Sequence, residues 1–462
     1  MCGMTAFAPT RSGISRRSLL TAAATLAGGG ALTACGMASG TPAPKDGTST
    51  RAKGGKAVFM ATGDAERFQI RDGLMPLLEE TTGVKGEWIH HAGAAYYDKL
   101  FSMMASDTAP DLFLFAPSYF AELVTSARLR NVTPLIKRDK YDLSDFPEKA
   151  IVQYTWQGNQ FGFPQDFPTR SLFYNVELFR RAGLALPPGD YGFNPTVWNW
   201  QRFQEAARKL TTGDPEAGGT YGWNTQYAWR QYSGWVFTNG AEVFNKEMTE
   251  CTITDAKPVE ALQLLPDMVH RHKVAPTRQV TQRENYETLF TSGRVGMVES
   301  LPGAINRYRA VQGFSFDVTP LPPGGTSGGA KAATGGGSGY GMFGGTKNVD
   351  AAWEFFKFIE GPEAQLAHAR GGATYPSRKS IQVHPEVAVA GRPPEHFKMF
   401  VEGQKYVRLD PQTSNWREIE AAIDKELVPL WDGERSAREA AAAVKRVVDP
   451  LLKAAEARKP RD

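Results

Sequence analysis

Residues 56–90 read KAVFMATGDAERFQIRDGLMPLLEETTGVKGEWIH and combine two hydrophobic periodicities. The short stretches at 56–60 and 84–90 are predicted to be β-strands. Between them, four apolar residues recur at the spacing of one helix face: Ile70, Leu74, Leu77 and Leu78. Gly83 follows this face and can end a helix. The stretch therefore predicts a strand, a helix and a second strand.

The same alternation continues after residue 90. Four apolar residues at helical spacing predict the next helix: Tyr97, Leu100, Phe101 and Met104. Residues 112–115, Leu-Phe-Leu-Phe, suit a parallel strand that is covered on both faces, and another helix face follows them. This order of strands and helices implies an α/β fold with a parallel sheet. Ligands bind such sheets at the carboxyl ends of the strands, here residues 62–64, 90–93 and 116–118.

The middle of the chain has weaker patterns. Residues 200–210 have the periodicity of a helix. Residues 221–237 mix aromatic and polar residues and predict loops. Residues 324–345 are dominated by glycine and predict a mobile loop followed by a short strand.

The first 35 residues carry the features of an export signal. Arg16 and Arg17 form a twin arginine, and an apolar stretch of small residues follows at 19–32. Small residues then precede Cys35, as a lipoprotein signal peptidase requires. This order predicts a signal peptide of the twin-arginine type over residues 1–34 and a lipid on Cys35. A general secretion signal, or a buried helix with an incidental cysteine, is the alternative.

Composition sets further limits. Residues 35–55 begin with the lipidated cysteine and are rich in Gly, Ala, Ser, Thr and Pro, which predicts a flexible tether. Cys2 lies in the predicted signal, so Cys251 is left alone and no disulfide can form within the mature chain. The remaining body of about 400 residues is long enough for two domains. The net charge of +4 gives no case for nucleic-acid binding.

Residues 158–175 read GNQFGFPQDFPTRSLFYN. They resemble a segment of the family 1 extracellular solute-binding proteins, in which G-x-x-Y/F-G-x-P is followed by an L-x-Y-N strand. Further segments match that family in order: ELFRRAGL at 177–184, WNW…AARKLT at 198–211, FTSGRVGM at 290–297, DVTPLP at 317–322 and YPSRKS at 375–380. The resemblance spans about residues 56–453, and a longer loop at 186–194 departs from it.

The resemblance implies two α/β lobes, a class II-like periplasmic-binding-protein fold with the ligand in the cleft between the lobes. The first lobe is expected to comprise residues 56–166 and 334–380, and the second lobe residues 167–333 and 381–458. The implied function is that of a monomeric lipoprotein on the outer face of the cytoplasmic membrane. It would deliver a mono- or oligosaccharide to the permease subunits of an ABC transporter, without catalysis, cofactor or metal.

Aromatic residues near the chain centre are candidates for sugar stacking, because a flat ring packs against the C–H face of a pyranose. Trp223 and Trp235 lie among Gly, Asn, Gln and Ser residues. Trp235 is the first choice, since Ser233-Gly234 before it and Asn239-Gly240 after it predict an exposed turn. Ordinary packing within a lobe is the alternative for each ring.

The polar candidates are placed mainly by the resemblance. Asp64, Asp166 and Glu299 fall at a lobe edge or a crossing, and a carboxylate accepts two hydroxyl hydrogen bonds. Helix capping or a surface salt bridge is the alternative for them. Arg378 either binds ligand or braces the hinge. The full predicted set of ligand-binding residues is Asp64, Asp166, Trp223, Trp235, Asn239, Glu299, Tyr340 and Arg378.

Two other functions remain open from the sequence. A secreted glycosidase would use two carboxylates such as Asp166 and Glu299, but no motif holds an acid and a base together. The same fold could instead bind a polyamine, an iron complex or glycerol phosphate. A phosphate cargo requires a basic cluster in the cleft, and the sequence alone does not locate one.

Overall fold

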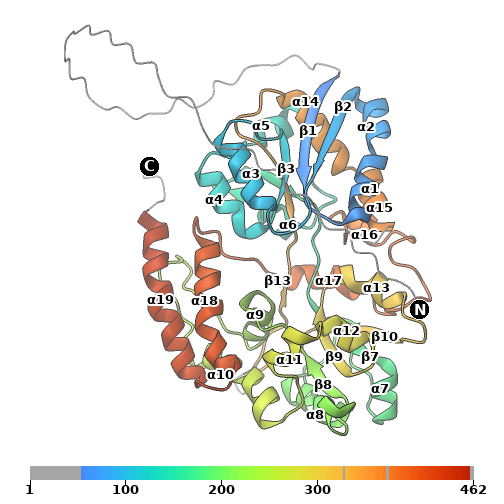
Figure 1. Ribbon diagram of the computed structural model, residues 1–462, viewed down its shortest axis with the longest axis vertical. Helices are drawn as coiled ribbons and strands as arrows, with labels where there is room; N and C mark the ends of the chain where they lie inside the picture. Colours follow the sequence, from blue (N-terminus) through green and yellow to red (C-terminus); the bar gives the residue numbers. More distant parts are fainter. Residues whose placement is uncertain (1–53, 326–327, 371–373, 458–462) are drawn as a thin grey trace, which may run out of the picture. The chain divides into compact units, whose positions relative to one another are not determined.

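The computed structural model describes residues 54–325, 328–370 and 374–457 (Figure 1). All of them belong to one unit, Ser49–Asp462. The predicted signal peptide, the tether and Cys35 lie outside the described residues. No helix within the described part of the chain is long and apolar enough to cross a membrane.

The first lobe is built on a five-stranded sheet of order β2-β1-β3-β12-β6. Its strands are β1 (Gly55–Ala61), β2 (Val84–His90), β3 (Leu112–Phe115), β6 (Gly162–Pro164) and β12 (Gly339–Met342). β1 pairs in parallel with β2 and β3, whereas β12 is antiparallel to its neighbours. All four residues of β3 are buried, as expected of a strand covered on both faces. The predicted strands at 56–60, 84–90 and 112–115 are therefore confirmed.

Helices cover this sheet. They are α1 (Ala65–Gly73), α2 (Met75–Thr82), α3 (Tyr96–Ala105), α4 (Phe120–Thr125), α5 (Thr133–Asp139), α6 (Glu148–Val152), α14 (Val349–Ile359) and α15 (Pro362–Arg370). The single helix expected across 70–78 is wrong, because it is divided at Leu74 into α1 and α2. Pro76 explains the division, since it has no backbone N–H to continue the α1 hydrogen bonds. Gly83 ends α2 with a left-handed φ of 73°, as predicted.

The second lobe has a four-stranded sheet of order β10-β7-β9-β8. Its strands are β7 (Ser171–Asn175), β8 (Tyr221–Asn224), β9 (Val295–Ser300) and β10 (Phe316–Thr319). The larger helices around it are α7 (Val176–Arg181), α8 (Trp200–Leu210), α9 (Trp229–Thr238), α10 (Ala256–Pro266), α11 (Arg278–Arg283), α12 (Tyr286–Thr291), α13 (Ile305–Arg309), α17 (Met399–Gly403), α18 (Trp416–Trp431) and α19 (Ala437–Ala457). The helix predicted at 200–210 is confirmed as α8.

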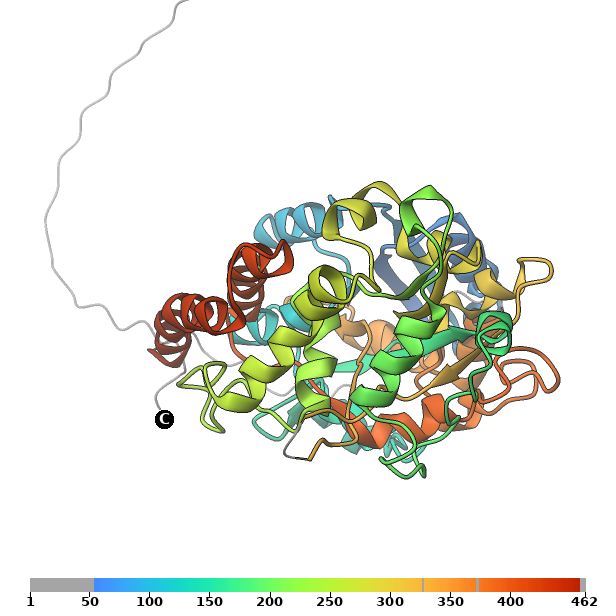
Figure 2. The same cartoon turned by 90° about the horizontal axis from the view of Figure 1, so that it is seen from below.

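The two C-terminal helices pack against each other (Figure 2) and contribute to the hydrophobic core of the second lobe. One of them also touches the first lobe. The guanidinium of Arg417 on α18 lies 3.9 Å from the ring centre of Tyr119, just before α4, and 3.7 Å from Glu122. The lobes therefore meet at α18 as well as through the crossing segments.

The aromatic stretch 221–237 is not a set of loops, and that expectation is wrong. It forms β8 and most of α9. Trp235 lies inside α9 with none of its side chain exposed, so the expected exposed turn is also wrong. Gly234 has a packing role instead, because a Cβ there would lie 2.8 Å from Leu321 Cδ1. A glycine that suggests a turn in the sequence is here a site of close approach between a helix and its neighbour.

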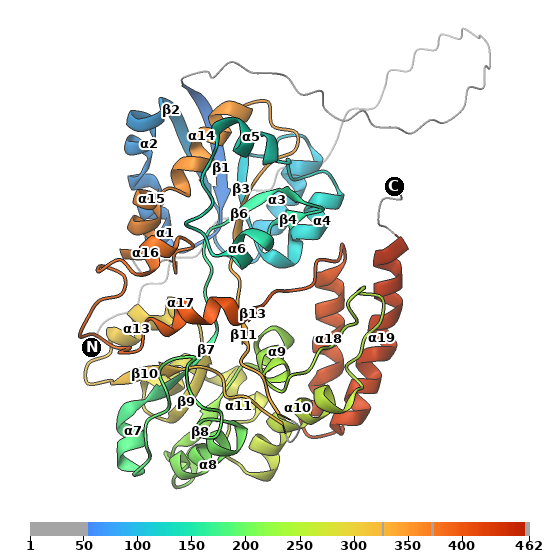
Figure 3. The same cartoon turned by 180° about the vertical axis from the view of Figure 1, so that it is seen from behind.

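Two crossing segments join the lobes side by side (Figure 3). The Gln165 N–H donates to Ser338 O at 2.9 Å, and the Arg170 N–H donates to Thr334 O at 2.8 Å. Gly337 is needed between them, since a Cβ there would lie 1.8 Å from Asp166 Oδ1 and 2.4 Å from its carbonyl oxygen. The short strand predicted at the end of the glycine-rich stretch 324–345 is confirmed as β12, and β11 (Ala333–Thr334) precedes it in the crossing segment.

Candidate ligand-binding cleft

A cavity of about 390 Å³ opens beside the first crossing segment, at the carboxyl end of β1. Its lining comes from the end of β1, from α1, from β3 and from three segments near the hinge: Thr62, Gly63, Asp64, Arg67, Arg71, Leu114, Gln165, Asp166, Ser338 and Thr374. This is the position that a parallel sheet offers to a ligand. The structure thus brings two predicted residues, Asp64 and Asp166, to one cavity.

Asp64 is both a helix cap and a wall of the cavity. Its Oδ1 accepts a hydrogen bond from the Arg67 N–H at 3.0 Å, which makes it the N-cap of α1. Its Oδ2 lies 3.4 Å from Arg67 Nη1, and 62% of its side chain is exposed. Because most of the Asp64 side chain is exposed, its carboxylate can still accept a hydrogen bond from a ligand hydroxyl.

Asp166 lies at the first crossing with its carboxylate largely enclosed. Burial raises its pKa to about 6, although a backbone hydrogen bond from Ser338 and the charges of Arg67 and Arg230 oppose the shift. Its Oδ1 is buried and has no hydrogen-bond partner among the described residues. A buried acceptor without a partner is costly, so this oxygen is suited to a hydroxyl donated by a ligand.

Glu299 is enclosed by protein groups in the second lobe. The Trp235 Nε1–H donates to its Oε2 at 2.8 Å, and the Thr225 hydroxyl lies at 3.4 Å from the same oxygen. Arg170 Nε is 3.6 Å from Oε1. Burial raises the pKa of Glu299 to about 7 against the opposing charge of Arg170. The predicted ligand carboxylate thus connects α9 to Arg170 at the hinge.

The other predicted residues are engaged by the protein. Trp223 and Trp235 are fully buried, with ring centres 5.1 Å apart, so neither has a free face for a sugar. Asn239 Nδ2 donates to Lys257 O at 2.9 Å, behind α9. Tyr340 lies within β12 and packs edge-on against Phe59 at 4.8 Å. Their ligand-binding roles stay predictions that this conformation does not favour.

Arg378 matches the bracing alternative. Its Nε donates to Glu360 O at 2.5 Å, its Nη2 donates to Tyr141 Oη at 2.9 Å, and its Nη1 lies 3.2 Å from Asp145. These partners hold residues 374–378, which line and border the cavity, against the first lobe. A role in positioning the hinge follows more directly from these contacts than direct ligand binding.

Sequence reasoning missed the cationic side of the cavity. Arg67 and Arg71 lie one turn apart on α1 and both line the cavity. Their spacing of four residues, directly after the β1 carboxyl end, was the signal that could have found them.

Arg230, at the start of α9, was missed as well. Burial raises the pKa of Asp166, at the crossing, and the pKa of Asp410. The positive charge of Arg230 opposes the rise in both cases. A cation of the second lobe therefore acts on a carboxylate of the cavity.

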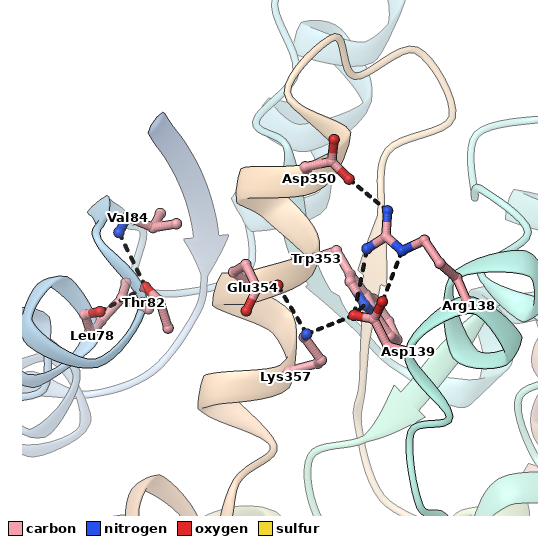
Figure 4. Close-up of polar contacts among 9 residues, drawn as sticks. All are labelled: Leu78, Thr82, Val84, Arg138, Asp139, Asp350, Trp353, Glu354 and Lys357. Atoms are coloured by element: carbon pink, nitrogen blue, oxygen red, sulfur yellow. Dashed lines mark hydrogen bonds and ion pairs between the residues drawn. The ribbon is translucent and has the colours of Figure 1, made fainter. Parts of the chain in front are cut away.

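A larger hollow of about 640 Å³ lies around Arg138 and Lys357, and both of these cations are paired with carboxylates of the protein (Figure 4). Arg138 Nη1 is 2.7 Å from Asp350, and Lys357 Nζ is 2.7 Å from Asp139. The Trp353 Nε1–H also donates to Asp139 at 2.9 Å. This network ties α5 to α14.

The sequence matches a model of the bacterial extracellular solute-binding proteins over residues 64–366. The chain belongs to this family. The resemblance carried by residues 158–175 is thus confirmed. The family and the relatives described below are binding proteins rather than enzymes, so the glycosidase alternative is set aside.

Three relatives illustrate the range of the family. A binding protein of Brucella abortus (strain 2308) is 27% identical over 221 residues, 46% of this chain and 50% of that protein. The arabinooligosaccharide-binding protein of Bacillus subtilis (strain 168) is 24% identical over 288 residues, 60% of this chain and 61% of its own. The sn-glycerol-3-phosphate-binding periplasmic protein of Pectobacterium atrosepticum is 26% identical over 328 residues, 65% of this chain and 68% of its own. The chain therefore spans about half to two thirds of these proteins.

Solved structures show the same two-lobed fold. An ABC substrate-binding protein of Listeria monocytogenes in complex with cycloalternan has a TM-score of 0.76 at 23% identity, covering 87% of this chain and 100% of that one. Maltose-bound T. maritima MalE3 has a TM-score of 0.71 at 20% identity, covering 86% and 99%. The expected periplasmic-binding-protein fold is thereby confirmed.

Proposed function

We propose that this solute-binding protein captures a carbohydrate outside the cytoplasm and delivers it to the permease subunits of an ABC transporter. The observation that carries the proposal is the cavity at the β1 carboxyl end, bounded by both paired crossing segments. Asp64 and Asp166 offer acceptors there, and Gln165 and Ser338 add polar groups that can bond hydroxyls. The arabinooligosaccharide-binding relative and the cycloalternan complex support a saccharide as the cargo.

The hinge explains how such a protein can capture and release its cargo. The two lobes are joined by extended segments, so they can change their angle while each hydrophobic core stays intact. A solute that contacts both lobes only in the closed form shifts the equilibrium toward closure. A difference of a few kcal/mol between open and closed forms also permits release at the transporter.

A glycerol phosphate cargo is the second candidate, because one relative binds sn-glycerol-3-phosphate and because Arg67 and Arg71 line the cavity. A thermal-shift screen of mono- and oligosaccharides, sn-glycerol-3-phosphate and putrescine separates the candidates. A solute that binds only the native state raises the melting temperature by mass action. The proposal expects a saturable shift with at least one saccharide and no turnover of it. A shift with sn-glycerol-3-phosphate or putrescine and with no saccharide would overturn it.

We also propose that Cys35 is the acylated N-terminus of the mature protein and holds it, as a monomer, at the outer face of the cytoplasmic membrane. The proposal rests on the twin arginine, the small residues before Cys35 and the tether in the sequence. Cys35→Ala is expected to release the protein from membranes. A matched Cys251→Ala variant should stay bound, because Cys251 is buried in the second lobe. Retention of Cys35→Ala on membranes after a high-salt wash would contradict the anchor.

A further inference from the structure

Arg71 is a buried cation whose hydrogen bonds are largely unused. None of the residue is exposed, yet it lines the cavity. Its Nη1 donates to Thr62 O at 2.9 Å, and the Tyr340 hydroxyl lies close enough to the guanidinium for the interaction to oppose the rise that burial causes in the Tyr340 pKa. Nε and Nη2 are buried and no described acceptor has hydrogen-bond geometry to them. Its guanidinium also lies 5.2 Å from the ring centre of Trp88. A ring face partly compensates a buried cation but does not accept its N–H bonds as an oxyanion does.

The other buried arginines of the described chain have acidic or carbonyl partners. Arg170 faces Glu299 at 3.6 Å, and Arg378 contacts Asp145 and Glu360 O. Burying a guanidinium costs several kcal/mol unless an anion and good hydrogen bonds offset the cost. Arg71 therefore lacks the kind of partner that the described residues supply to Arg170 and Arg378.

A second arginine and an uncharged, buried histidine lie near Arg71. Arg67, one turn earlier on α1, lines the same cavity. His368 on α15 is buried without a partner for either ring nitrogen, and its pKa is lowered to about 3 by burial and then by the charges of Arg71 and Arg67. The nine-residue helix α1 also directs its N-terminus to the cavity edge at Asp64, where its dipole favours an anion.

Asp64 and Asp166 also line the cavity, but the cations with which they interact are Arg67 and Arg230 rather than Arg71. Asp64 lies 3.4 Å from Arg67 and caps α1. The cations that chiefly lower the pKa of Asp166 are Arg67 and Arg230. Burial still leaves the Asp166 pKa at about 6, so its protonation can accompany the binding of an anion. Among the described residues that line the cavity, Arg71 is the cation with no carboxylate within ion-pair distance.

We propose that the solute is an acidic saccharide, a polyhydroxylated molecule with a carboxylate or phosphate group, and that Arg71 with Arg67 binds this group in the first lobe. The inference rests on the proposed carbohydrate function and deepens it. A guanidinium donates two parallel N–H bonds to a carboxylate or phosphate, which matches the free Nε and Nη2 of Arg71. Asp64, Gln165 and Ser338 would then bond the hydroxyls of the same molecule.

The test is calorimetric titration of the full-length protein with matched ligands: glucuronate, galacturonate, their oligomers, glucose 6-phosphate, and the neutral parents of each. We expect an acidic member to bind at least about tenfold more tightly than its neutral parent in low salt, with the preference shrinking as salt is raised. The carboxylate and phosphate arms identify which group fits. Equal binding of acidic and neutral forms would overturn this inference and leave the carbohydrate function standing. No binding by any saccharide would overturn both.

Variants assign the effect to the two arginines. Arg71→Met is expected to abolish the preference, so that the acidic ligand binds at least about tenfold more weakly while neutral parents change by less than about threefold. Arg67→Gln, at a partly exposed side chain, should reduce the preference about threefold and is the fallback if Arg71→Met fails to fold. The control is Arg180→Gln on α7, an exposed arginine paired with Glu177. A preference that survives both Arg71→Met and Arg67→Gln would contradict the assignment.

Discussion

The two lobes differ in how their buried charged side chains are paired. Beside the first-lobe cavity, Arg71 is buried with no carboxylate partner among the described residues, and the half-buried Asp166 has an enclosed Oδ1 without a hydrogen-bond partner there. In the second lobe, the buried Glu299 accepts a hydrogen bond from Trp235 at Oε2, and its Oε1, which also lacks a hydrogen-bond partner, lies 3.6 Å from Arg170. An opposite charge offsets the cost of burying a charged side chain, whereas a buried cation without one is suited to an anionic ligand. The comparison supports the proposal that the ligand binds on the first-lobe side and that Glu299 and Trp235 support the fold of the second lobe.

The largest expected effect concerns Trp235, which this contrast makes structural. Trp235→Ala should destabilise the protein by about 3–5 kcal/mol, because it opens a cavity in the second-lobe core and removes the hydrogen bond to Glu299. Chemical denaturation without ligand measures the change. Trp235→Phe is the matched control, since it keeps most of the ring volume and loses the hydrogen bond.

An unchanged stability combined with weakened saccharide binding would contradict this account of Trp235. It would return the residue to the ligand-stacking role that the sequence suggested. The contrast between the lobes would then lose its second-lobe half.

A second effect concerns the crossing beside the cavity. Gly337→Ala should cost about 1–3 kcal/mol, because its Cβ would meet both Oδ1 and the carbonyl oxygen of Asp166. The same experiment on Gly73→Ala provides the control, since a Cβ at that α1 position meets nothing within 4 Å. Equal stabilities for the two variants would show that the crossing is looser than described.

The smallest expected effect is a pH dependence. The pKa of Glu299 is about 7 in the folded protein, against an ordinary value of 4.5. Its stabilising contribution is therefore complete below pH 4.5 and is lost as the pH rises through 7. Glu299→Gln removes this loss, so the variant should gain about 1–2 kcal/mol relative to the parent between pH 6 and pH 8.

Denaturation at both pH values measures that difference. Glu360, whose pKa burial raises to about 8, adds the same trend to both proteins and cancels in the comparison. A constant difference between the two proteins across this range would mean that Glu299 titrates normally and is not enclosed.

The sequence predicted the parts of the fold that follow from local patterns. The stretches predicted as strands at 56–60, 84–90 and 112–115 became β1, β2 and β3. The run at 112–115 is the clearest case, because continuous apolar residues suit a strand covered on both faces. The rule for parallel sheets then located Thr62–Asp64 at the cavity.

The missed features depend on contacts between distant segments. Ser233 and Gly234 suggested a turn in the sequence, but they lie within α9, where Gly234 allows the helix to pack closely against Leu321. Arg71 breaks the rule that charged residues face water, and only the assembled cavity explains its position. Gly337 packs closely against Asp166, which lies 171 positions earlier in the chain, and no local sequence pattern encodes such a contact.

The solute is proposed to bind at the first-lobe cavity, and a crystal structure of the protein with the tightest-binding saccharide from the screen would locate it. We expect solute density inside the cavity, with solute oxygens about 2.7–3.2 Å from Arg71 Nε or Nη2 and from Asp166 Oδ1. Density away from these atoms, or stacked on an opened Trp223 or Trp235, would contradict it.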